Sequence, residues 1–124
     1  MVDGQIPSID NDGYLVLPAN AKLTITFAWH TQVPISEPYT VFAHLYKDNQ
    51  LVAQHDGWPG DNQRPTFTWQ ADEVVIDQHT IIIPNSPVGF TGILAVGMYQ
   101  SDTLQRQFWD SGVDILTLST VRFK

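Results

Sequence analysis

Hydrophobic and polar residues alternate along several segments of this chain with the period of a β-strand. The clearest case is residues 22–30, where Leu23, Ile25, Phe27 and Trp29 fall on one face. Successive side chains of a strand point to opposite faces, so this segment is predicted to be a half-buried strand. Further strands, rich in β-branched and aromatic residues, are predicted over residues 13–17, 39–46, 51–56, 73–83, 90–99 and 115–123.

Less regular segments lie between these strands. Residues 66–69 are expected to form another short strand, and residues 106–109 are expected to return along the strand before them. The long segment 73–83 is expected to bend or bulge near Asp77 and Gln78. Residues 57–65, with two prolines and two glycines, form the longest irregular stretch.

Residues 39–56 are predicted to form a β-hairpin, because Asp48 and Asn49 between the two strands tolerate positive φ. A loop of three residues would put His44 and His55 on opposite faces. A loop of two or four residues, the favoured interpretation, would make them diagonal neighbours roughly 7–8 Å apart. That register pairs Tyr46 with Leu51, His44 with Ala53 and Phe42 with His55.

The number and spacing of these segments predict the fold class. Roughly seven to nine strands with frequent turns favour an all-β, two-sheet antiparallel β-sandwich of the immunoglobulin or fibronectin type III kind, with a jelly roll as the alternative. Eight prolines and eight glycines are spread along the chain, without a long helical period. A length of 124 residues suits one domain over residues 1–124.

Composition narrows the classes of partner. The chain has 13 acidic and six basic residues, a formal net charge of −7. It therefore lacks the positive surface that nucleic acids and anionic membranes attract. Cysteine is absent, which excludes disulfides and thiol nucleophiles. No apolar run approaches the roughly 20 residues that cross a bilayer, so no membrane insertion by this chain is expected, and no signal peptide is recognised.

An ordered series of short motifs carries a family resemblance. The motifs are Tyr39-Thr-Val-Phe-Ala-His-Leu45, Leu51-Val-Ala-Gln-His-Asp-Gly57, Pro65-Thr66 with Trp69, Glu73-Val-Val-Ile-Asp77 and Val96-Gly-Met-Tyr99. The series resembles the β-sandwich segment at the C-terminal end of bacterial multi-span glycosyltransferases of the dolichyl-phosphate-mannose-dependent type. The chain departs from that pattern at Trp58, where proline or a small residue is usual, and at Asp72, where glycine is usual. The resemblance implies an immunoglobulin-like accessory domain outside the membrane, and it carries over no catalytic residue.

The four histidines could be structural or could bind a metal. Zinc sites use three or four converging ligands, typically at short spacings, whereas these histidines fall on different predicted strands. His44 and His55 with Asp77 or His79 would be the metal-binding alternative. Hydrogen-bonded structural histidines are the favoured interpretation, and no cofactor is expected.

The carboxylates do not suggest an enzyme. Adjacent strand residues point to opposite faces, so His55 and Asp56 cannot form one catalytic dyad. Glu73 and Asp77 would lie about 13 Å apart along a strand, beyond the spacing that glycoside hydrolysis needs. Residues 10–13 look like the start of a calcium loop but lack its later ligands, so an Asx turn is favoured there.

Trp58 gives the strongest indication of a binding site. It lies among turn-forming residues, where an exposed indole could stack on a sugar ring while Asp61, Asn62 and Arg64 bind its hydroxyls. The alternative is an indole folded back over the edge of the sandwich. Trp29 and Trp69 are predicted to lie in the core, and Trp109 in the core or at an edge.

The hairpin supplies a second candidate surface. Phe42, His44 and Tyr46 form either an aromatic platform or the buried face of a central strand, and His44 and His55 are further candidate ligand-binding residues. The expected function is a non-catalytic accessory domain that contacts a glycan or a membrane-protein partner outside the cytoplasm. A stand-alone carbohydrate-binding module is the alternative, and a metal-dependent enzyme is a remote one.

Overall fold

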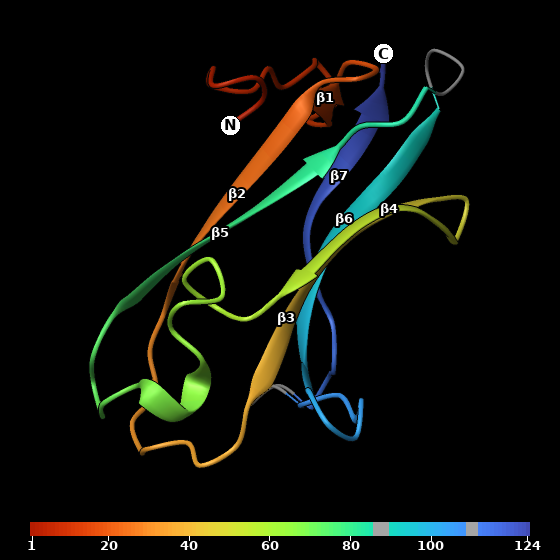
Figure 1. Ribbon diagram of the computed structural model, residues 1–124. Coiled ribbons are helices and arrows are strands. Elements are labelled where there is room, and N and C mark those ends of the chain that lie inside the picture. Colours follow the sequence, from red (N-terminus) through yellow and green to blue (C-terminus); the bar gives the residue numbers. More distant parts are fainter. Residues whose placement is uncertain (86–89, 109–111) are drawn as a thin grey trace.

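Seven strands and one short helix form the chain in the computed structural model, which describes residues 1–85, 90–108 and 112–124 (Figure 1). The alternating segments are all strands, as predicted, and the all-β fold is confirmed. In chain order the elements are β1 Leu15–Leu17, β2 Lys22–Trp29, β3 Tyr39–Lys47, β4 Gln50–Gly57, η1 Thr66–Thr68, β5 Val75–Ile82, β6 Thr91–Gln100 and β7 Leu116–Phe123.

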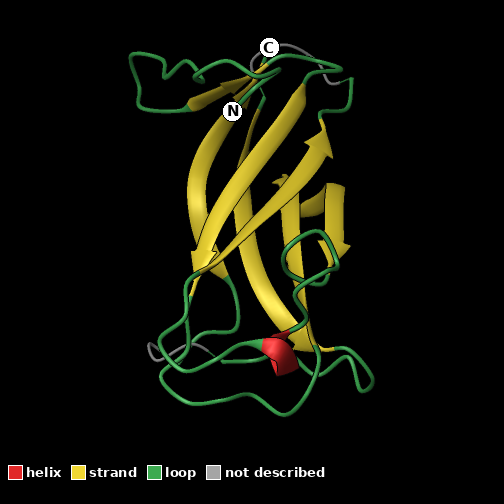
Figure 2. Cartoon of the chain, turned by 60° about the vertical axis from the view of Figure 1, so that its left-hand side comes forward, coloured by secondary structure: helices red, strands yellow, loops and turns green. Residues whose placement is uncertain are grey.

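The strands form two sheets that face each other, as the sandwich prediction requires. One sheet has the order β1-β7-β6-β3-β4, and the other pairs β2 with β5 (Figures 1 and 2). All strand pairs are antiparallel except β1 with β7, which is parallel, so the expectation of purely antiparallel sheets is wrong at this edge. Figure 1 shows β2 and β5 as one layer and the longer sheet as the other.

Side chains between the two sheets form two apolar clusters. The first gathers around Leu17, Leu45 and Phe123, and the second around Val41, Trp69 and Val96. Trp69 is 5% exposed, which confirms its place in the core, whereas Trp29 is only half-buried at the border of the second cluster. Trp109 lies outside the described residues.

The β3–β4 hairpin has the predicted two-residue turn but not the predicted register. Asp48 and Asn49 have φ of 51° and 65°, the left-handed backbone that such a turn needs. Tyr46 pairs with Leu51 as expected, but Leu45 then pairs with Ala53, so Val52 is an extra residue in β4.

This bulge moves His55 to the other face of the sheet. Beyond it His44 pairs with Gln54 and Ala43 pairs with His55. The prediction that His44 and His55 share a face is therefore wrong, because one inserted residue inverts every later side chain of a strand.

Two other local expectations are wrong, and a third is confirmed in part. Residues 66–68 form a 3₁₀ turn rather than a strand, since the Thr68 backbone N–H and hydroxyl both donate to the carbonyl of Pro65. β5 pairs with β2 without a register shift, so it has no bulge at Asp77. Residues 106–107 do return beside β6, as expected, through an antiparallel bridge between Arg106 and Tyr99 and a hydrogen bond from the Gln107 N–H to the Met98 carbonyl, although they do not extend into a strand.

Candidate functional site

The chain leaves β4 at Gly57 and turns tightly before it reaches η1. Gly60, Asp61 and Asn62 have φ of 65°, 57° and 64°, a left-handed run that glycine, aspartate and asparagine tolerate best. The Trp58 N–H donates to the Asn62 side-chain oxygen at 2.8 Å, which closes the turn. Asp61 and Asn62 are exposed at its tip, as the sequence interpretation expects.

The Trp58 indole is half-buried and held in one orientation. Its Nε1–H donates to the Ser101 hydroxyl at 3.0 Å, and its ring meets Phe67 edge-on with centroids 6.0 Å apart. Phe67 is 49% exposed. Trp58 therefore combines the two alternatives raised by the sequence, since the indole packs back on the sandwich and still borders an exposed ring.

Arg64 is committed to a structural contact. Its guanidinium donates to Glu73 at 2.7 Å and to Thr68. The hydrogen bond between Arg64 and Glu73 raises the pKa of Arg64 and lowers the pKa of Glu73. Arg64 thus joins the end of the loop to the segment before β5, rather than extending into solvent with Asp61 and Asn62.

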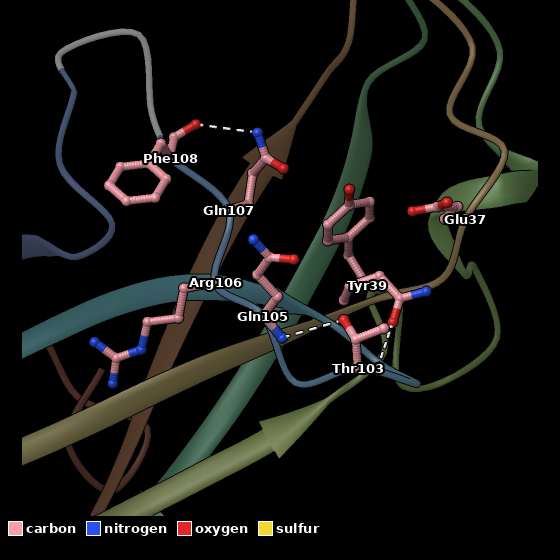
Figure 3. A pocket seen from close by; sticks show the side chains of 8 residues that line it. Glu37, Tyr39, Thr103, Gln105, Arg106, Gln107 and Phe108 are labelled. Atoms are coloured by element: carbon pink, nitrogen blue, oxygen red, sulfur yellow. Dashed lines mark hydrogen bonds between the residues drawn. The ribbon is translucent and has the colours of Figure 1, made fainter.

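A surface pocket of about 400 Å³ lies at the same end of the sandwich (Figure 3). It is lined by Glu37, Tyr39, Gln100, Thr103, Gln105, Arg106, Gln107 and Phe108. Figure 3 shows the Tyr39 ring beside the Gln105 and Gln107 amides, while Arg106 extends away from them. Gln100 precedes Ser101, the hydroxyl partner of Trp58, so the pocket and the Trp58 turn belong to neighbouring loops.

His44 lies on the outer face of the five-stranded sheet, among aromatic rings. Its ring centroid is 4.5 Å from that of Phe42, and its Nδ1 lies 3.0 Å from the Tyr46 hydroxyl. Asp56 is 3.6 Å from Nε2, near enough to attract a charge but too far for a hydrogen bond. Burial lowers the pKa of His44, Arg106 lowers it further, and Asp56 opposes both effects. The predicted aromatic platform is thus largely a buried face.

His55 lies on the inner face, where it contacts buried His79 of β5, which in turn contacts buried Asp77. Its Nδ1 is 2.8 Å from Nδ1 of His79, and Nε2 of His79 is 2.7 Å from the Asp77 carboxylate. We call these three residues the histidine relay. Sequence reasoning treated Asp77 and His79 only as spare metal ligands; the missed signal was two polar residues at inward positions of an alternating strand.

Metal binding finds little support in the described part of the chain. There, no three histidine, cysteine, aspartate or glutamate side chains are grouped to hold an ion. The turn at residues 10–13 is the expected Asx turn, with Asp10 accepting from the backbone N–H groups of Asp12 and Tyr14. Arg122 donates to both Asp10 and Asp12, so a guanidinium already neutralises the carboxylates that calcium would use.

Comparison of the chain with protein-family models, with curated proteins and with solved structures finds no match. Within the described residues no helix is long and apolar enough to cross a membrane. The function therefore has to be inferred from the residues themselves.

Proposed function

We propose that this chain is a non-catalytic binding domain for neutral oligosaccharides. The observation that carries the proposal is the pocket of about 400 Å³ in Figure 3, which is lined by two aromatic residues and three glutamines. Small-molecule sites typically have volumes of about 300–1,000 Å³ and combine apolar surface with a few placed polar groups. The Trp58 and Phe67 rings extend the proposed contact surface over the neighbouring loop.

The chemistry of the lining favours sugars over other ligands. Exposed Phe108 and half-buried Tyr39 offer ring faces for the apolar side of a pyranose. Glutamine amides both donate and accept hydrogen bonds, as hydroxyl groups require. A net charge of −7 disfavours anionic ligands, because the field of the whole protein repels them.

The proposed setting is an accessory role beside a membrane glycosyltransferase, outside the cytoplasm, as the motif resemblance implies. The strand order supports an immunoglobulin-like form of the sandwich. Variable-type immunoglobulin domains pair strands G, F, C and C′ in one sheet and B with E in the other. Here β7, β6, β3 and β4 are neighbours in one sheet, and β2 pairs with β5 in the other.

A glycan-array screen of the purified domain, followed by titration calorimetry, tests the proposal. Binding should fall at least about tenfold in Trp58→Ala and in the double variant Gln105→Ala/Gln107→Ala, since each removes ring or amide contacts worth more than about 1.4 kcal/mol. Gln50→Ala, an exposed glutamine at the far end of the hairpin, is the matched control and should bind as the parent does.

Two results would contradict the proposal. One is a folded parent domain that binds no glycan on the array. The other is binding that survives unchanged in both Trp58→Ala and the double glutamine variant, because the contact surface would then lie elsewhere.

A further inference from the structure

Two members of the histidine relay, Asp77 and His79, form a buried polar layer between the two apolar clusters, and the third, His55, is exposed. Asp77 and His79 are each 1% exposed. They lie between Val75, which belongs to the second cluster, and Ile81, which belongs to the first, on the inner face of β5. Burying such groups is costly unless their hydrogen bonds are made. Every hydrogen-bonding atom of the Asp77 and His79 side chains has a partner, so the layer is tolerated at positions where valine or isoleucine would pack more simply.

Asp77 connects this layer to the Trp58 turn. One carboxylate oxygen accepts from the Trp29 indole at 2.9 Å and lies 2.7 Å from His79, and the other accepts from the backbone N–H of Gly60 at 3.0 Å. Gly60 lies two residues after Trp58, and His55 lies two residues before Gly57, where β4 ends. The relay thus contacts the turn at Gly60 and the last residues of β4, which lead into the turn, at His55.

The order of the hydrogen bonds dictates how many protons the relay can hold. When Nε2 of His79 donates to Asp77, a neutral His79 has its lone pair on Nδ1. His55 must then donate from its Nδ1, across the 2.8 Å gap. One added proton is accommodated, either on His55 or on His79 beside the carboxylate. A second proton would make both histidines cationic, with the Nδ1–H of His55 facing the Nδ1–H of His79. The hydrogen bond between the two rings would then be lost.

Within the described part of the chain, no carboxylate other than Asp77 forms an ion pair with His55 or His79, so no further negative charge offsets a second proton. Among the described residues, no lysine or arginine forms an ion pair with Asp77. The Asp56 side chain lies on the outer face of the sheet, beside His44 of β3, and so faces away from the relay. Arg64 is paired with Glu73, and Asp61 is exposed at the tip of the turn. The neighbouring inward side chains of β2 and β3 are uncharged: Phe27, Trp29, Val41 and Ala43.

We infer that the histidine relay is a proton-sensitive anchor for the turn at residues 58–64. It holds the turn while it carries at most one added proton, and it releases the turn when both histidines are charged. Protonation of an imidazole requires acidification, so the turn is expected to be released as the pH falls. The inference rests on the proposed function in one respect, namely that this turn carries part of the ligand surface.

Amide hydrogen exchange of Gly60, measured by NMR without any ligand, tests the anchor directly. The protection factor of Gly60, which corrects for intrinsic exchange, should fall about tenfold between about pH 7.5 and about pH 5. His55→Gln, on the exposed side of the relay, cannot take up the second proton and should abolish that fall. His30→Gln, an exposed histidine outside the relay, is the matched control and should retain it.

The anchor is refuted if Gly60 protection does not change with pH in the parent domain, or if His55→Gln shows the same fall as the parent. Loss of oligosaccharide binding at about pH 5 in the parent, but not in His55→Gln, would support the link to the ligand surface. A pH-dependent Gly60 in a domain that binds no oligosaccharide would leave the anchor standing and refute the proposed function. Binding that stays unchanged while Gly60 loses protection would refute the link between them.

Discussion

The described residues contain two histidine–carboxylate pairs, one inside the sandwich and one on the outer face of its larger sheet. Inside, His79 and Asp77 are 2.7 Å apart and every hydrogen-bonding atom of the two side chains has a partner. Outside, His44 and Asp56 are 3.6 Å apart, and Nε2 of His44 is buried without a hydrogen bond among the described residues. The same two residue types are thus fully bonded in one place and incompletely bonded in the other.

The difference shows what burial does to a histidine. The inner pair has exchanged water for an indole, a backbone amide and a second imidazole, so its polar groups remain satisfied. In the outer pair, Nε2 of His44 has lost water without a replacement, and burial lowers the pKa of His44. The inner pair should stabilise the fold at neutral pH, and the outer histidine should add a separate loss of stability as the pH falls.

The largest expected effect is the loss of the inner carboxylate. Asp77→Ala removes an acceptor that the Trp29 indole, the Gly60 N–H and His79 share, and breaking a buried pair in this way costs about 3–5 kcal/mol. Asp56→Ala, the matched change in the outer pair, should cost less than about 1 kcal/mol, because that carboxylate is partly exposed. Urea denaturation of both variants measures the difference. Equal losses of unfolding free energy would contradict the comparison.

A smaller effect is expected from crowding the outer face. Gly97 lies beneath Phe42, where a Cβ atom would overlap the aromatic ring and approach the Asp114 carbonyl to 2.9 Å. Gly97→Ala should therefore cost about 1–3 kcal/mol by overpacking. Adding Phe42→Leu makes room for the new methyl group, so the double variant should lose less stability than the sum of the two single changes. Additive losses would show that the ring does not confine this position.

The smallest expected effect is the pH dependence of the outer pair. The folded pKa of His44 is below its ordinary value of 6.5, so the unfolded chain takes up a proton that the folded chain refuses. The contribution of His44 to stability is therefore present above about pH 6.5 and is lost as the pH falls below it. His44→Gln should flatten this part of the stability profile relative to the parent. An unchanged slope would show that His44 is not buried in the way described.

The regular strands were predictable from sequence because their signal is local. Alternation along residues 22–30 identified β2, and the Asp48-Asn49 turn identified the hairpin. The bulge at Val52 was not predictable in the same way. A bulge depends on how both faces of β4 pack. A single inserted residue does not change the amino-acid pattern enough to be recognised in the sequence.

The candidate site was predictable only in part. Trp58, Asp61 and Asn62 were recognised from turn chemistry, and they do lie on one tight turn. Arg64 was assigned to the same surface but is held by Glu73, a pairing that depends on where the chain meets β5. The pocket and the histidine relay combine residues from distant segments, and no local pattern predicts such contacts.

The most direct test of the proposed function is a chemical-shift titration of the ¹⁵N-labelled domain with mannotriose, cellotriose and chitotriose at neutral pH. The proposed surface predicts shifts at the Trp58 indole and at the side-chain amides of Gln105 and Gln107 for at least one of the three sugars. A second pocket of about 330 Å³ lies at the opposite end, lined in part by Tyr14, Tyr46 and Asn49. Shifts confined to that end, or no shifts with any of the three sugars, would contradict the proposed contact surface.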